Sequence, residues 1–210
     1  MAAVIDAPVY GSARQNVLTR LASRLALQAR RRRHHLFVRA TGLAPTDRIL
    51  DVACGRGGLR VLDREHQITG FDRLDPAGIE RPYVQGDARA MPFPDGAFDV
   101  VYCNSLIEHV GPADRARVAN EIRRVAARYF VQTPNRWFPI EPHVLLPLFQ
   151  FLPRALKRRA WRVGASRGPF EEIHLLTAAE LKGLFPDAEI VRERLGPLTK
   201  SLMAVRGPTG

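Results

Sequence analysis

Short apolar segments recur through the first two thirds of the chain and are separated by amphipathic stretches. Each apolar segment is bounded by polar or turn residues, which predicts strands at residues 49–53, 67–71, 82–85, 97–103 and 129–132. Strands that alternate with helical stretches are typical of a doubly wound parallel sheet. Ligands of such sheets bind at the carboxyl ends of the strands, so we expect the functional residues there.

Helical periodicity fills the intervals between these strands. We expect a helix over residues 12–40, a short one near 59–64, and one that opens at Gly111-Pro112, with Val118, Ile122 and Val125 buried and Arg115 exposed. Only about ten residues separate the second and third strands, too few for a crossover helix with its two loops.

The end of the chain continues the pattern of helix and strand. Thr177 and Glu180 form a capping-box pattern that predicts the start of a further helix. Two more strands are expected, at residues 188–194 and 198–205.

The first predicted strand runs into a glycine-rich bend, RILDVACGRGG, residues 48–58. Glycines let the backbone approach a ligand at a distance that no β-carbon would permit. The dinucleotide fingerprint fails because Arg60 takes the place of its third glycine, and the P-loop pattern fails because Leu59 and Arg60 follow Gly58. The remaining pattern, D-x-A-x-G-x-G, resembles the first motif of the class I S-adenosylmethionine-dependent methyltransferases, with Ala53 where that family usually has Gly.

The resemblance covers roughly residues 47–134 and is most specific at 91–110, MPFPDGAFDVVYCNSLIEHV, which is similar to the small-molecule "type 11" branch. It implies an α/β fold with S-adenosylmethionine as the cofactor. The expected architecture is a Rossmann-like, doubly wound, mainly parallel seven-stranded sheet, with the last two strands forming a hairpin. We expect one domain over residues 1–210, with an N-terminal helical cap at 12–40 and a lid insertion after the fifth strand.

Cofactor-binding residues follow from spacing and from the resemblance. Asp72 lies 21 residues after Asp51, near the interval of about 20 residues at which an acidic residue reaches the ribose hydroxyls. The resemblance implies that Asp87 accepts a hydrogen bond from the adenine amino group, that the Ala88 amide faces the ring, and that Asn104 lies near the methionine end. The full expected set is Asp51, Ala53, Cys54, Gly55, Gly57, Asp72, Arg73, Asp87, Ala88 and Asn104.

The regular alternation stops after residue 133, and we name residues 134–170 the lid segment. Prolines and aromatic residues fill its first part, whereas its second part is basic, with Arg154, Lys157, Arg158, Arg159 and Arg162. In the family that the motifs resemble, an insertion here covers the methyl-transfer end of the cofactor. The segment is therefore expected to bind the acceptor. A basic stretch beside exposed aromatics also fits peripheral membrane contact, and packing of the aromatics onto the body of the protein is the alternative.

Candidate catalytic residues are the histidines near these regions. A hydroxyl acceptor must lose a proton as it takes the methyl group, so O-methylation needs a general base. The candidates are His143, His109, His174 and Glu141, with Glu108 as a further carboxylate. Glu108 and His109 supply two potential metal ligands, but no third carboxylate lies nearby in the sequence, so no metal site is expected.

The charge balance widens the range of possible partners. The 210 residues carry 32 Lys plus Arg against 21 Asp plus Glu, a net charge of +11. Such basicity favours nucleic acid, phosphorylated substrates or anionic membranes, or reflects solvated Arg faces. Residues 30–33 are all Arg, but the Asn/Asp-Pro-Pro-aromatic motif of amino-directed nucleic-acid methyltransferases is missing, since Ser105 and Leu106 follow Asn104.

These features favour methyl transfer to a small molecule or a glycan or lipid precursor, most simply at oxygen. The alternatives are a nucleic-acid methyltransferase and a non-catalytic cofactor-binding protein that docks on a membrane or an acidic partner. A cytoplasmic location is expected, because the two cysteines form no disulfide framework and residues 1–11 do not have the pattern of a secretory signal. No feature of the sequence predicts the number of subunits.

Overall fold

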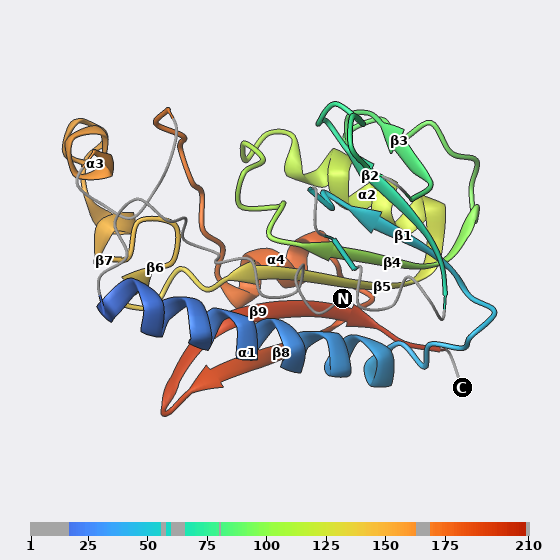
Figure 1. The fold of residues 1–210 in the computed structure, drawn as a ribbon, viewed down its shortest axis with the longest axis horizontal. Helices are drawn as coiled ribbons and strands as arrows, with labels where there is room; N and C mark the ends of the chain where they lie inside the picture. The colour runs from blue at the N-terminus through green and yellow to red at the C-terminus, as the bar shows by residue number, and fades with distance from the viewer. Residues whose placement is uncertain (1–16, 56–57, 60–65, 80, 163–168, 209–210) are drawn as a thin grey trace.

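The computed structural model describes residues 17–55, 58–59, 66–79, 81–162 and 169–208 (Figure 1). A seven-stranded sheet forms its centre, in the order β3-β2-β1-β4-β5-β9-β8. The strands are β1 (Arg48–Val52), β2 (Gln67–Asp72), β3 (Tyr83–Gln85), β4 (Phe98–Asn104), β5 (Ala126–Pro134), β8 (Glu189–Leu195) and β9 (Leu198–Arg206). The five strands from β3 to β5 are parallel, and β9 runs antiparallel to both β5 and β8. The predicted α/β fold, with a final hairpin, is confirmed.

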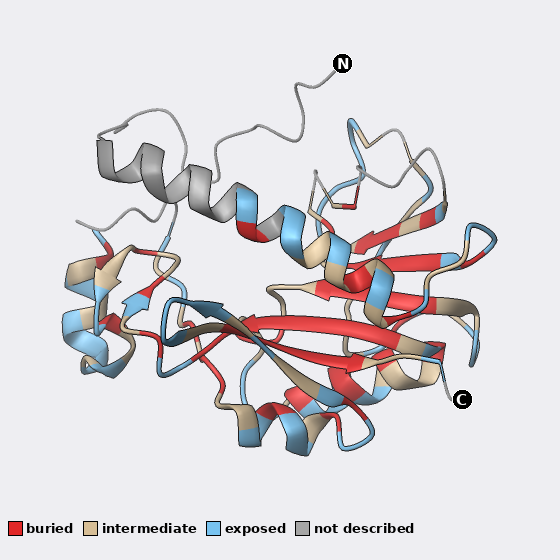
Figure 2. Cartoon of the chain, turned by 90° about the horizontal axis from the view of Figure 1, so that it is seen from below, coloured by how far each residue is buried: buried red, intermediate tan, exposed pale blue. Residues whose placement is uncertain are grey.

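Helices cover both faces of the sheet. Helix α1 (Val17–Ala40) crosses one face, while α2 (Arg115–Val125) and α4 (Ala178–Leu184) lie on the other (Figure 2). Successive residues of β1 point to opposite faces, so Ile49 packs in the core cluster of Phe37 and Leu50 in that of Ile122. The central strands β1, β4 and β5 are therefore buried between two apolar layers, as their nearly continuous apolar sequences require.

The N-terminal end of α2 differs from the prediction in two ways. The helix begins at Arg115, and Gly111 and Pro112 lie before it in a turn in which the Asp114 amide donates to the Gly111 carbonyl. Arg115 is buried, not exposed, because its guanidinium donates to the carbonyls of Ile107 and Val110. These bonds compensate the cost of burying the charge.

Other predicted helices compare with the structure as follows. The predicted helix near 59–64 falls mainly on residues 60–65, outside the described part of the chain. No helix occurs between β2 and β3 in the described residues there, 73–79 and 81–82, in agreement with the short interval. The capping box is confirmed, with the Glu180 amide donating to Thr177 Oγ1 and the Thr177 amide to Glu180 Oε2.

The lid segment leaves the sheet at the end of β5. It contains the paired strands β6 (Ile140–Glu141) and β7 (Leu146–Pro147), the 3-10 helix η3 (Phe149–Phe151) and the helix α3 (Arg154–Trp161). Val144, Phe149 and Trp161 form a small core with Ile173 and Leu175. The segment therefore has its own apolar centre at the left of Figure 1, beyond the edge where the parallel strands end. Among the described residues, no helix is long and apolar enough to cross a membrane.

Candidate active site

The glycine-rich bend is built around a buried carboxylate. Asp51 is only 2% exposed, and its Oδ2 accepts a hydrogen bond from the Leu59 amide at 2.8 Å and lies 3.5 Å from Arg81 Nη2. A β-carbon at Gly58 would lie 2.2 Å from that same Asp51 oxygen, and the Gly58 φ of +38° is itself unfavourable for other residues. The Asp51 carboxylate therefore packs against the bend at Gly58 and Leu59, and it is engaged by groups of the protein itself.

The end of β2 meets the bend. Asp72 Oδ2 accepts a hydrogen bond from the Gly55 amide at 2.8 Å, and its Oδ1 accepts one from the Leu74 amide at 3.2 Å. Ala53, beside them, has a φ of 56°, a left-handed conformation that glycine would adopt more easily. Gly57 lies outside the described residues. Burial raises the pKa of Cys54 to about 11, and the neighbouring Asp51 contributes to the rise.

A cavity of about 400 Å³ opens at these strand ends. It is large enough for a nucleoside-sized ligand, since small-molecule sites span roughly 300–1,000 Å³. Of the predicted cofactor-binding residues, it is lined by Ala53, Asp72, Arg73, Asp87 and Ala88. Asp51, Cys54, Gly55 and Asn104 do not line it, although Gly55 is joined to the cavity wall through Asp72.

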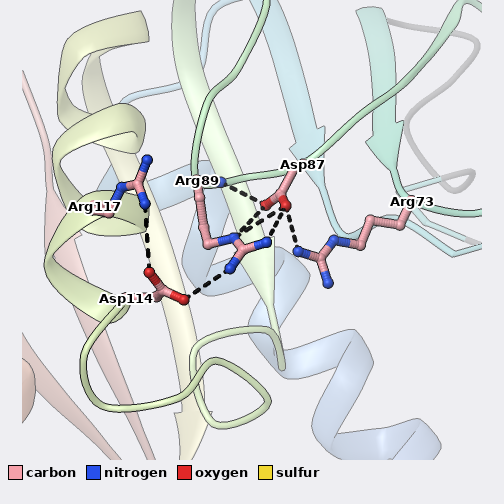
Figure 3. Close-up of polar contacts among 5 residues, drawn as sticks. All are labelled: Arg73, Asp87, Arg89, Asp114 and Arg117. Atoms are coloured by element: carbon pink, nitrogen blue, oxygen red, sulfur yellow. Dashed lines mark hydrogen bonds and ion pairs between the residues drawn. The ribbon is translucent and has the colours of Figure 1, made fainter.

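Asp87 sits between two arginines (Figure 3). Arg89 donates to both of its oxygens, with Nη2 at 2.7 Å from Oδ2, and Arg73 Nη2 lies 2.5 Å from the same Oδ2. Arg89 also donates to Asp114 Oδ2 at 2.8 Å, and Arg117 Nη1 lies 3.7 Å from Asp114 Oδ1. The hydrogen bonds from Arg89, joined by Arg73, hold the pKa of Asp87 well below its usual range. Asp87 is therefore ionised and fixed, and an adenine amino group would compete with guanidinium groups for its oxygens.

Two of the predicted catalytic histidines meet beside the cavity. His109, which lines the cavity, follows β4, whereas His143 comes from the lid segment, and their rings are perpendicular with centroids 5.0 Å apart. His109 Nδ1 is 2.9 Å from Glu171 Oε1, and His143 Nδ1 is 2.6 Å from Glu141 Oε1. Each imidazole is thus oriented by a carboxylate on its Nδ1 side. Glu141 also accepts the His143 and Val144 amides, so it holds the turn that carries His143.

Glu108 lies close to both imidazoles. Its side chain is fully buried, and Thr133 Oγ1 donates to its Oε2 at 3.1 Å. Burial raises the pKa of Glu108 above its usual range. Burial also acts to lower the pKa of His143, but the Glu141 hydrogen bond and the neighbouring carboxylates more than offset it, so that pKa is raised.

The other two predicted site residues lie apart from this pair. The His174 side chain lines a second, smaller cavity of about 180 Å³ with Arg115 and Lys157, although its backbone amide donates to the Glu108 carbonyl. Asn104 ends β4, and its Oδ1 is buried with no hydrogen-bond partner among the described residues.

Sequence reasoning missed Glu171 and the role of Arg81. Both residues lie in irregular segments, where no periodicity marks their side-chain direction. The partners that they reach, His109 and Asp51, are distant in the sequence, so no local signal in the sequence identified either one.

Comparison with known proteins agrees with this geometry. Residues 50–128 match the family model described as "Methyltransferase domain". Together with the sheet order, this match confirms the resemblance found in the sequence. The chain is an S-adenosylmethionine-dependent methyltransferase, and the findings support its placement in the type 11 branch of the class I enzymes.

Similar curated proteins include several named methyltransferases. A ubiquinone/menaquinone biosynthesis C-methyltransferase of Xanthomonas oryzae pv. oryzae is 28% identical over 193 residues, covering 80% of this chain and 76% of that protein. A 2-phytyl-1,4-naphtoquinone methyltransferase of Synechocystis is 29% identical over 139 residues, covering 50% of this chain and 58% of that protein.

Solved structures share the fold. The magnesium protoporphyrin IX methyltransferase of Synechocystis, with S-adenosylhomocysteine bound, has a TM-score of 0.59 at 15% identity and covers 94% of this chain and 91% of its own. A Pyrococcus horikoshii protein, PH0226, has the same TM-score at 20% identity and covers 87% and 92%. At these identities, the likeness shows the fold alone.

Proposed function

We propose that this enzyme methylates a hydroxyl group on an apolar small molecule or lipid precursor. The observation that carries the proposal is the His109–His143 pair, because His109 lines the cofactor cavity and contacts His143 of the lid segment, and each imidazole is oriented by a carboxylate. The quinone methyltransferases among its relatives are consistent with an apolar acceptor.

The cavity fits the cofactor in the chemistry of its walls. In this proposal Asp72 accepts the ribose hydroxyls, and Asp87 and Ala88 contact the adenine ring; the support is that all three residues line the cavity. The sulfonium of S-adenosylmethionine supplies an already activated methyl group. The protein then needs to hold the acceptor in line with the departing sulfur, and positioning of this kind supplies most of the acceleration.

The imidazole pair would remove the proton of the acceptor. The acceptor O–H bond breaks, its proton passes to His143 or His109, and the oxygen forms the new bond to the methyl group as the sulfur leaves as a thioether. Deprotonating an aromatic hydroxyl also makes its ring carbons more nucleophilic, so the same base would serve a carbon target. We expect His143→Ala to lower kcat by roughly 10²–10⁴-fold without changing cofactor affinity.

The exposed side chains of the lid segment support the proposal that it contacts lipid. Trp137 and Phe151 are exposed, and their rings lie 5.8 Å apart. Leu148 and Leu156 are exposed near them, and α3 carries the exposed cations Arg154, Arg158 and Arg159. Apolar side chains beside cations suit the surface of an anionic bilayer. We therefore propose that the acceptor reaches the site from a membrane surface, and that the enzyme works on the cytoplasmic side.

Cofactor binding comes first among the tests. Calorimetric titration with S-adenosylmethionine and S-adenosylhomocysteine should show saturable binding, weakened by roughly tenfold or more in Asp72→Ala, which loses a charged acceptor. Asp75→Ala is the matched control, since Asp75 is exposed and accepts a hydrogen bond from the Ala77 amide. Absence of binding at millimolar cofactor would overturn the proposal.

The acceptor and the lid are tested next. Incubation of apolar phenols and hydroquinones with ¹³C-methyl cofactor, read by NMR, separates O-methyl from C-methyl products, and exclusive C-methylation would contradict the oxygen target. Vesicle co-sedimentation should show binding to phosphatidylglycerol that a Trp137→Ser/Phe151→Ser double variant loses. Leu195→Ser, which changes an exposed leucine outside the lid segment, should bind as the unaltered protein does.

A further inference from the structure

Three side chains with metal-binding atoms converge where the lid segment meets the sheet. One potential ligand atom from each of Glu108, His109 and His143 lies within 4.8 Å of the others. Glu108 and His109 follow β4, whereas His143 lies more than thirty residues further along the chain. The third ligand that the local sequence lacked is therefore supplied by the lid segment.

The two imidazoles are arranged as metal ligands are. His109 uses its Nδ1 for Glu171 and His143 its Nδ1 for Glu141, so both present Nε2 as the remaining nitrogen. Metal-bound histidines commonly donate the other ring N–H to a carboxylate, which fixes the tautomer and makes the ligand nitrogen more basic. Two such pairs beside one carboxylate are difficult to explain by packing alone.

Glu108 provides an independent observation. Its side chain is fully buried, and its Oε1 has no hydrogen-bond partner among the described residues, whereas its Oε2 accepts from Thr133. A buried carboxylate oxygen without a partner destabilises the folded protein, because it has lost its hydration. A cation at this place would satisfy it.

We infer that Glu108 Oε1, His109 Nε2 and His143 Nε2 bind a divalent transition-metal ion, for which zinc is the natural probe. Two histidines and one glutamate are a ligand set of catalytic zinc sites, which keep a fourth position open. Zinc bonds of about 2.1 Å place tetrahedral ligand atoms roughly 3.4 Å apart, so atoms within 4.8 Å of one another need to close by at most about 1.4 Å.

The role of the ion rests on the proposed function. An acceptor hydroxyl bound at the open position would lose its proton to solvent more readily, because the ion would stabilise the oxyanion. The oxygen would then form its bond to the methyl group as the carbon–sulfur bond breaks and the sulfur keeps the electron pair. The imidazoles would in this case bind the ion instead of the proton.

Metal binding is measured without reference to methyl transfer. Chelator-treated protein is titrated with Co²⁺, whose visible absorption reports ligand geometry, and with Zn²⁺ against a chromophoric chelator. We expect one ion per chain and tetrahedral-type Co²⁺ bands. Zinc affinity should fall at least about tenfold in His143→Ala and Glu108→Gln, and by roughly 10–100-fold in Glu141→Gln, which removes the charge of the carboxylate that the His143 Nδ1 contacts.

Matched controls separate the possible outcomes. His35→Ala removes an exposed histidine outside the cluster and should leave zinc affinity unchanged. Circular dichroism and cofactor titration show whether each variant is folded. Equal zinc affinity in the unaltered protein and His143→Ala overturns the metal site and leaves the methyltransferase proposal standing if the cofactor still binds. Tight zinc binding without cofactor binding would instead overturn the proposed function alone.

Discussion

Arg73 and Asp87 are joined across the cofactor cavity, with Nη2 of the arginine 2.5 Å from Oδ2 of the aspartate. Arg73 follows the aspartate expected to bind ribose, and Asp87 is the residue expected to bind adenine. The pair therefore connects the two halves of the nucleoside site, and Arg89 holds Asp87 from the other side. If adenine binds Asp87, some of these contacts must break, and their loss lowers the net affinity for the cofactor.

Removal of Arg73 should make Asp87 more available. We expect Arg73→Ala to tighten cofactor binding by roughly threefold, because one competitor for the carboxylate is lost, whereas Asp87→Ala should weaken it by about tenfold. Calorimetry measures both. Arg117→Ala is the control, since Arg117 has the same side-chain exposure of 65% but lies 3.7 Å from Asp114, away from Asp87. Loss of affinity in Arg73→Ala would show that Arg73 itself binds the ligand.

Gly58 should be irreplaceable on steric grounds. Its φ is +38°, and an added β-carbon would lie 2.2 Å from both Asp51 and Arg81. We expect Gly58→Ala to lower the free energy of unfolding by about 1–3 kcal/mol. Gly183→Ala is the comparison, because Gly183 lies in α4 with open space around it and should gain about 0.5–1 kcal/mol. Equal melting temperatures for the two variants would contradict the close approach under the bend.

Alkylation of Cys54 should become fast only at high pH. Burial, with help from Asp51, raises its pKa to about 11. Because the thiolate is the reactive form, only roughly 1% is reactive at pH 9, and the alkylation rate should rise about tenfold per pH unit until the pKa is reached. Mass spectrometry of the peptide after iodoacetamide treatment, in a Cys103→Ser background, measures this rate. Reaction that levels off below pH 9 would contradict the buried position.

Asp187 should make the free energy of unfolding depend on pH in the acidic range. Burial acts to raise its pKa, but the hydrogen bond from Tyr129 and the charges of Arg123 and Arg206 more than offset it, so the pKa is lowered from 3.8. A lowered folded-state pKa contributes stability above the unfolded-state value, and this is lost as pH falls through the folded-state value.

Asp187→Asn tests this contribution. We expect the variant to be about 1–2 kcal/mol less stable at pH 7, with the difference shrinking below pH 4. Denaturant unfolding at several pH values measures it. Asp95→Asn is a control, because Asp95 pairs with Arg124 but its side chain is 83% exposed. A difference for Asp187→Asn that is constant with pH would show that the charge of Asp187 does not contribute.

The sheet was predictable because its signal is local. The strands β1, β4 and β5 are largely apolar segments, and Asp72 at the end of β2 and Asp87 just after β3 are brought to one edge by the parallel arrangement. The start of α2 was not predicted correctly, since Pro112 is suited to the first turn of a helix but lies in the preceding turn. Arg115 was misjudged because the carbonyls that satisfy it belong to a loop whose path periodicity does not report.

The site depends on contacts between distant parts of the chain. His143 and His109 were both candidates from the sequence, but their perpendicular contact depends on how the lid segment folds back. Glu171 reaches His109 from 62 residues away, and Arg81 reaches Asp51 beneath the bend. Side chains that meet through tertiary packing leave no pattern in either local stretch.

Backbone contacts join the start of the lid segment to Leu176, a few residues beyond its end. Asn135, directly after β5, pairs with Leu176, and the Arg136 amide donates to the Leu176 carbonyl at 2.9 Å. The chain therefore leaves the body of the protein and returns to it at neighbouring residues, with a separate apolar core between. A related enzyme could exchange residues 137–175 for another stretch and acquire a different acceptor while the sheet, with Asp72 and Asp87, stays as it is. The exchange would also replace Glu171, so the cofactor cavity would change at the wall that His109 and Glu171 share.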